Sequence, residues 1–153
     1  MLITTLILSF LLGGAEPGPV STELLPVQPE ALAKLAPATV RIEVEGKATV
    51  YTGVPLAAIL DQRAQPIAGM PGLRDLSDAV LLARGADGYQ AAISAASVAM
   101  DPKGERYLLA IQRNGQAISP QVIIPADPKR ARWVRDVVAI RLVRLRTLVR
   151  ETP

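Results

Sequence analysis

The side chains of this chain that could do chemistry are arginine, lysine, carboxylates, hydroxyls and tyrosine, because its 153 residues include neither cysteine nor histidine. Without them there is no thiolate nucleophile, no Ser-His-Asp triad and no Cys or His ligand for zinc, haem or an iron–sulfur cluster. The acidic residues show no paired spacing typical of a metal site or a glycosidase. We therefore predict no catalytic residue and no metal site.

The most concentrated chemical feature is a basic segment around the single tryptophan. Lys129, Arg130 and Arg132 precede Trp133, and Arg135 follows it. Arginine forks match phosphate and carboxylate groups, so the segment is a candidate anion site. A solvated turn and the basic edge of a last strand are the alternative. Trp133 itself could stack on a ligand or anchor the core.

A second candidate is the Asp87-Gly88-Tyr89 sequence. Asp87 and Tyr89 could place a carboxylate and a phenol at the rim of a cleft, although Asp and Gly are also the residues that a tight turn requires. Tyr51 and Tyr107 lie in strand-like runs, where they could line a pocket or be half-buried core residues.

The beginning of the chain resembles a targeting segment. Residues 1–15 contain an uncharged apolar run followed by Gly13-Gly14-Ala15, which suits cleavage of a signal peptide before Glu16. The run is shorter than the roughly 20 residues that cross a bilayer. We predict a signal peptide and a periplasmic or secreted bacterial protein. Residues 16–38 hold five prolines and are predicted to form an extended leader with one short helix at Glu30 to Leu35.

The elements that must position the candidate residues follow from hydrophobic periodicity and turn signals. Residues 39–146 are predicted to form one domain, followed by a tail at 147–153. Asn114-Gly115 is the strongest hairpin signal. The predicted strands are 40–44 with 48–52, 78–84 with 89–94, 106–113 with a partner near 122–124, and 133–143 with a helical tail. The predicted helices are 55–63 and one turn at 95–100. The predicted fold class is α+β, mainly antiparallel or mixed β with two or three short helices.

Four segments carry a family resemblance: YTGVPLAAIL (51–60), DAVLLARGADGYQAAIS (78–94), YLLAIQRNGQAI (107–118) and VIIPADPKRARWVRDVVAI (122–140). Their order and spacing resemble the sulfite-oxidase-type molybdopterin-binding domain. The resemblance implies the fold of that family and, for its active members, oxidoreductase chemistry on molybdenum held by the pterin and one protein cysteine. It also implies that Lys129, Arg130 and Arg132 match the segment that meets the pterin phosphate.

The chain departs from active members at the metal. Their cysteine lies between the first strand and the GVPL helix, where this chain has only residues 46–52 and no cysteine. It resembles more closely the short, exported, cofactor-poor members. We therefore expect a non-catalytic binding or accessory module without a cofactor, whose partner is a small anion or a periplasmic protein. The alternative is a molybdopterin-dependent oxidoreductase, or a subunit of one, that retains the pterin.

The positive charge of the chain bears on two further classes of partner, nucleic acids and membranes. The calculated isoelectric point of about 9.6 does not predict nucleic-acid binding, because the basic residues are not interleaved with aromatics. Eight basic residues lie between positions 129 and 150, and several of them follow Trp133. They would allow weak contact with an anionic membrane surface, as in a structural protein held by an uncleaved amino-terminal segment.

Overall fold

The computed structural model of the chain describes residues 22–63, 76–127 and 129–145. The predicted signal peptide at 1–15, the segment between the predicted helix at 55–63 and the second hairpin, and the predicted tail at 147–153 therefore lie wholly or mostly outside the described residues. The elements in chain order are β1 (Thr22–Leu25), α1 (Pro29–Leu32), β2 (Ala38–Val44), β3 (Lys47–Pro55), α2 (Leu56–Leu60), β4 (Ala79–Gly85), β5 (Gln90–Ser94), α3 (Ala95–Ala99), β6 (Leu108–Arg113), β7 (Gln116–Ile123) and β8 (Val137–Arg144).

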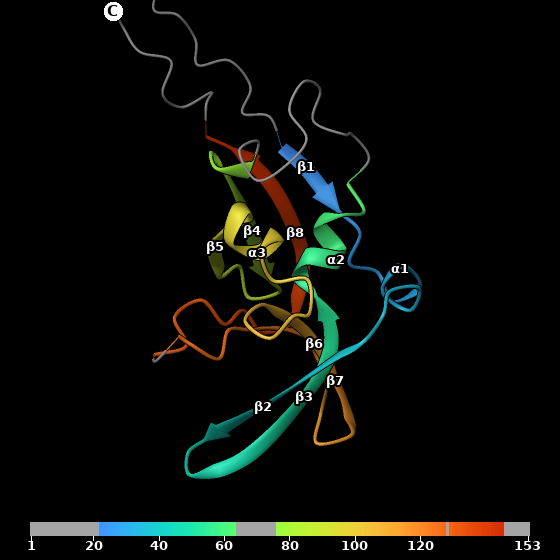
Figure 1. Cartoon of the computed structure of the whole chain (residues 1–153), viewed down its shortest axis with the longest axis vertical. Coiled ribbons are helices and arrows are strands. Elements are labelled where there is room, and N and C mark those ends of the chain that lie inside the picture. The colour runs from blue at the N-terminus through green and yellow to red at the C-terminus, as the bar shows by residue number, and fades with distance from the viewer. Residues whose placement is uncertain (1–21, 64–75, 128, 146–153) are drawn as a thin grey trace, which may run out of the picture.

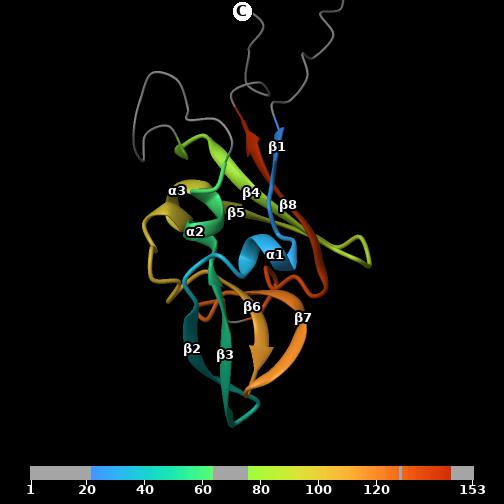
Figure 2. The same ribbon diagram turned by 90° about the vertical axis from the view of Figure 1, so that its right-hand side faces the viewer.

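The strands form two four-stranded sheets, with the orders β1-β8-β4-β5 and β2-β3-β6-β7. Every neighbouring pair is antiparallel. Figure 1 and Figure 2 show the first sheet in the upper half of the molecule and the second sheet below it, with α2 and α3 beside the junction. The α+β class, the antiparallel β content and the three short helices agree with the sequence prediction.

Alternation of apolar and polar residues explains how the first sheet buries one face. In β4, Leu81 and Ala83 are buried while Arg84 is exposed. In β8, Ile140 and Leu142 are buried on the same face, and Arg141 between them is exposed. This face packs with α2, α3 and one face of the second sheet into the main hydrophobic core.

The second sheet carries a smaller cluster on its other face. Its buried members are Val40, Tyr51, Leu108, Ala110 and Ile123, and Trp133 packs against both this cluster and the main core. The second sheet is therefore apolar on both faces near its centre. One face belongs to the main core, and the other needs a cover.

The structure explains the Gly53-Val54-Pro55-Leu56 sequence by the contacts of its first and last residues with the neighbouring chain. A β-bulge lies between Thr52 and Gly53, where β3 shifts its register against β6. A Cβ atom added at Gly53 would lie 2.0 Å from the Leu109 carbonyl oxygen, so only glycine allows this close approach of the two backbones. Leu56 N–H then donates to the Tyr107 carbonyl oxygen at 3.0 Å, which ties the start of α2 to the chain leading into β6.

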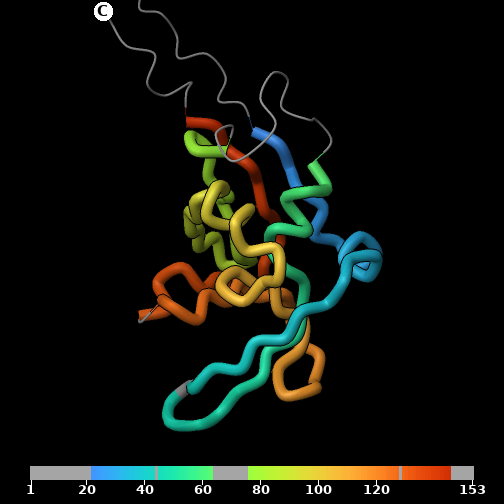
Figure 3. Tube along the Cα trace, in the orientation of Figure 1, coloured from blue at the N-terminus to red at the C-terminus, as the bar shows by residue number. Residues whose placement is uncertain are grey.

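Part of the segment predicted as an extended leader is folded into the domain. Strand β1 pairs with β8, and α1 follows after three residues. Leu25, Val27 and Leu32 are all buried in the main core. Figure 3 shows the blue trace of β1 beside the red trace of β8, so the two ends of the described chain meet in one sheet.

The predicted strand at 133–143 is wrong at its beginning, because β8 starts only at Val137. Asp136 has a φ of 47°, a left-handed conformation that interrupts an extended strand. The Val134 carbonyl oxygen accepts a hydrogen bond from Val122 N–H at 2.9 Å, which holds the preceding residues against β7. Trp133 to Asp136 therefore form a loop over the second sheet. The partner of β6 is also longer than predicted, since β7 begins directly after the Asn114-Gly115 turn.

Candidate functional site

The floor of the candidate site is the smaller apolar face of the second sheet. Tyr51 on β3 and Arg113 on β6 are direct cross-strand partners, so their side chains leave the sheet on the same side. Ile118 and Gln121 on β7 complete the floor. Tyr51 is 4% exposed, which makes it a core residue and a lining residue at once.

Trp133 forms the wall that covers this face. Its ring meets the Tyr51 ring edge-on, with 6.0 Å between centroids and an interplanar angle of 84°. Its indole Nε1–H donates to the Ile124 carbonyl oxygen at 2.8 Å. The ring is thus fixed by one hydrogen bond and one aromatic contact, which gives the wall a defined position.

Arg130 lies against the same tryptophan. Its guanidinium carbon is 5.2 Å from the centroid of the Trp133 ring, within the range of a cation–π contact. The backbone of Arg130 has a φ of 53°, and its carbonyl oxygen accepts from Trp133 N–H at 3.0 Å. This tight turn directs the arginine toward the cleft.

Asp127 holds the loop in place through both its side chain and its backbone. Its Oδ2 accepts from Arg132 N–H at 2.8 Å and forms an ion pair with Arg132 Nε at 3.4 Å. Arg130 N–H donates to the Asp127 carbonyl oxygen at 3.1 Å. The Asp127 carboxylate therefore already compensates the charge of Arg132. Asp127 contacts Arg130 only through the backbone and does not compensate its charge.

Together these parts enclose an open cleft of about 560 Å³, within the size range of small-ligand sites. The lining residues come from the β2–β3 turn, the second sheet and the loop before β8: Glu45, Tyr51, Arg113, Ile118, Ser119, Gln121, Arg130, Trp133, Arg135 and Asp136. Figure 1 shows the β2–β3 hairpin and the orange loop between β7 and β8 extending to the same side of the molecule.

The cleft has three positive and two negative side chains. Within the described part of the chain, none of Arg113, Arg130 and Arg135 forms an ion pair with a carboxylate. Arg113 and Arg135 are exposed and Arg130 is half-buried. Guanidinium groups in this state are free to bind a carboxylate or phosphate group with paired N–H donors.

The structure brings together three of the residues singled out from the sequence. Arg130, Trp133 and Arg135 line the cleft. Lys129 and Arg132 belong to the same loop but do not line it; Lys129 is exposed, and Arg132 is paired with Asp127.

Asp87 and Tyr89 act at a distance from the cleft. Asp87 Oδ1 accepts from Tyr89 N–H at 2.9 Å and closes the β4–β5 turn, in which Gly88 has a φ of 85°. The Tyr89 hydroxyl donates to the Ala131 carbonyl oxygen. The turn thereby fastens the loop that carries Arg130 and Trp133, so Tyr89 positions the wall instead of lining it.

Sequence analysis did not single out Arg113, Ser119 or Gln121. Arg113 is the residue before the Asn114-Gly115 turn, and Asn114 ties this turn to β3: its N–H donates to the Val50 carbonyl oxygen at 2.7 Å, and its Oδ1 accepts from Val50 N–H at 2.8 Å. A basic residue directly before a strong hairpin turn is the signal that could have pointed to it.

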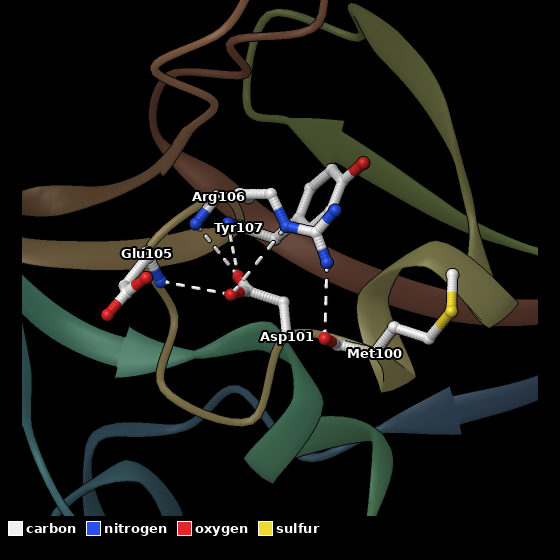
Figure 4. A network of polar contacts seen from close by, with 5 residues as sticks. All are labelled: Met100, Asp101, Glu105, Arg106 and Tyr107. Carbon is white, nitrogen blue, oxygen red and sulfur yellow. Dashed lines mark hydrogen bonds and ion pairs between the residues drawn. The ribbon is translucent and has the colours of Figure 1, made fainter.

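A second polar centre surrounds Asp101, which is 5% exposed (Figure 4). Its Oδ2 accepts from the backbone N–H groups of Arg106 at 2.9 Å and Tyr107 at 2.8 Å, and its Oδ1 accepts from Glu105 N–H at 3.2 Å. Arg106 Nη2 donates to the Met100 carbonyl oxygen at 3.1 Å. The carboxylate is fully used in holding the loop between α3 and β6.

The donor set does not fit a thiolate-ligated molybdenum. The chain has no cysteine or histidine, and the described residues contain no group of three acidic side chains close enough to hold a metal ion. Nothing in the chain supplies the thiolate ligand that such a metal would take from the protein. We therefore derive no reaction step through that cofactor.

The comparisons with known proteins give no relative from which a function could be proposed. No protein-family model matches the sequence, and no curated protein matches it either. Among the described residues, no helix has the length and apolar character needed to cross a bilayer.

Proposed function

We propose that this protein is an exported, non-catalytic binding module that takes a small anion in the cleft between the second sheet and the loop of Arg130 to Asp136. One observation carries the proposal: three arginines without a carboxylate partner in the described chain line one cleft beside a fixed aromatic wall. Export is proposed from the apolar segment at residues 1–15.

The physical argument rests on how arginine binds anions. A guanidinium presents a rigid fork of N–H donors, and hydrogen bonds to a charged group contribute about 1.5–3 kcal/mol each. The Arg130 guanidinium already lies against the Trp133 ring, so less of its side-chain freedom is lost on binding than for an arginine on a flat surface. Ser119 and Gln121 offer further polar contacts in the same cleft.

The proposed fold relation is to the sulfite-oxidase-type molybdopterin-binding domain, on the ordered motifs of the sequence. We propose that the module works without a bound cofactor, because the chain lacks the cysteine that active members use. The competing proposal is a subunit of a molybdopterin-dependent oxidoreductase that holds the pterin phosphate with the same arginines. Analysis of molybdenum and oxidised pterin in protein purified from its native compartment separates the two. A ratio near one per chain would support the oxidoreductase and overturn our proposal.

The binding test is calorimetric titration of the full chain with inorganic phosphate. We expect saturable one-site binding that the double variant Arg113→Gln/Arg135→Gln weakens at least about tenfold, the effect of losing more than 1.4 kcal/mol. The matched control is Arg84→Gln/Arg141→Gln, which removes the same charge from the exposed face of the first sheet. Equal weakening by both pairs, or no binding at all, would contradict an anion site in the cleft.

A further inference from the structure

The cleft holds two carboxylates as well as three arginines. Glu45 lies in the β2–β3 turn and Asp136 lies at the end of the loop before β8, and both line the cleft. In the described part of the chain neither carboxylate is in an ion pair with an arginine of the cleft. The site therefore offers separate positive and negative groups to a ligand.

This arrangement favours an anion that also carries a positive group over a simple anion. A carboxylate beside a bound phosphate repels it, whereas the same carboxylate attracts an ammonium group on the same ligand. The two carboxylates come from separate segments, the β2–β3 turn and the loop before β8. The aromatic rings of Tyr51 and Trp133, which line the same cleft, give the carbon chain of the ligand an apolar surface to lie on.

We infer that the cleft binds a small soluble zwitterion, with its anionic end on Arg113, Arg130 and Arg135 and its ammonium end toward Glu45 or Asp136. This inference rests on the proposed function, because it needs the arginines to hold an anion. It adds the class of ligand: a phosphate or carboxylate joined to an amine by a short carbon chain. The volume of about 560 Å³ leaves room for such a molecule.

The experiment compares two pairs of probes that differ in one ammonium group. Phosphoethanolamine is titrated against ethyl phosphate, and γ-aminobutyrate against butyrate, with the full chain in low-salt buffer. We expect the ammonium-bearing member of at least one pair to bind about fivefold more tightly, the ratio that one exposed ion pair can give. Equal or weaker binding of both ammonium-bearing probes would overturn the inference.

Variants assign the preference to the two carboxylates. In Glu45→Gln/Asp136→Asn the advantage of the ammonium group should disappear while ethyl phosphate binds as tightly as before or more tightly. Asparagine tolerates the left-handed backbone at position 136, so the substitution keeps the loop. The control Glu43→Gln/Asp61→Asn removes the same net charge outside this cleft and should keep the preference. If the preference survives in the first double variant, the carboxylates do not select the ligand.

The outcomes separate this inference from the proposed function. If ethyl phosphate binds through the arginines and the ammonium group brings no gain, the anion site stands and the zwitterion inference is wrong. If no probe of either pair binds, and inorganic phosphate does not bind, both are wrong. Binding to phosphatidylethanolamine vesicles without binding to free phosphoethanolamine would also overturn the inference, because it would point to a membrane ligand.

Discussion

At the scale of single residues, carboxylate side chains have two different roles in this chain. The Asp101 carboxylate is buried and occupied by backbone N–H groups, so it is part of the scaffold. Glu45 and Asp136 are exposed and line the cleft, so they can act on a ligand. Burial and hydrogen-bond partners, which sequence spacing does not show, separate the two roles.

Replacing Asp101 by Asn tests the scaffold role. The amide keeps the shape but turns one acceptor into a donor that faces backbone N–H groups, so the free energy of unfolding should fall by about 2 kcal/mol. Urea denaturation measures this change, with Glu43→Gln as an exposed control expected to change it by less than about 0.5 kcal/mol. Equal stability of the two variants would show that the Asp101 hydrogen bonds contribute little.

The Tyr89 hydroxyl is the second residue whose role can be isolated. Tyr89→Phe removes the hydrogen bond to Ala131 and loosens the loop that carries Arg130. We expect phosphate affinity to fall by up to about fivefold, corresponding to about 1 kcal/mol, with a smaller effect on stability. Tyr107→Phe, outside the cleft, should leave the affinity unchanged. A larger loss of affinity in Tyr107→Phe would contradict the positioning role of Tyr89.

Sequence patterns identified part of the site at this scale. The basic segment around Trp133 pointed to Arg130 and Arg135, which line the cleft. Lys129 and Arg132 have the same residue type and neighbourhood but not the same role, because Asp127 folds back on Arg132. The contribution of Arg113 depends on the pairing of β6 with β3, a contact between residues far apart in sequence.

At the scale of elements, local turn chemistry explains which strands could be predicted. Gly46, Gly88 and Gly115 all have positive φ in the three hairpin turns, and all three hairpins were predicted from their sequences. The loop of Trp133 to Asp136 was predicted as strand because its residues favour extended structure. Asp136 has a φ of 47°, and its carbonyl oxygen accepts a hydrogen bond from Ala86 N–H at 2.9 Å, a contact between distant segments that no local pattern encodes.

Substitutions at Asn114 test how the β6–β7 turn is attached to β3. Asn114→Ala loses the hydrogen bond from Val50 N–H and places alanine at a φ of 52°, so unfolding should become easier by about 2 kcal/mol. Asn114→Gly loses only the hydrogen bond and should cost about half of that. Thermal unfolding distinguishes them, with Gln112→Ala as the exposed control. Equal costs for Ala and Gly would mean that backbone strain plays no part.

At the scale of the whole molecule, the domain closes by bringing its two ends together. β1 and β8 are neighbours in the first sheet although more than a hundred residues separate them in sequence. Proline content suggested an extended leader at 16–38, but such a composition is also compatible with a short edge strand. Only the buried positions of Leu25, Val27 and Leu32 show that this segment contributes to the core.

Adjacent leucines on β1 test this closure. Leu25 is 0% exposed and Leu24 is 59% exposed. Leu25→Ala should lower the free energy of unfolding by about 2–5 kcal/mol, because it leaves a cavity in the core, whereas Leu24→Ala should change it by no more than about 0.5 kcal/mol. Chemical denaturation of both variants gives the comparison. Similar small effects would mean that β1 is only loosely attached.

The central claim is that an anion binds beside Trp133, and the single tryptophan of the chain allows a direct measurement. The fluorescence of Trp133 is followed while inorganic phosphate is added at constant ionic strength. We predict a saturable change in emission in the natural chain and in Arg84→Gln/Arg141→Gln, whereas Arg113→Gln/Arg135→Gln should need at least about tenfold more phosphate for the same change. A flat emission curve in the natural chain, or the same curve in all three proteins, would contradict the assignment of this cleft as the binding site.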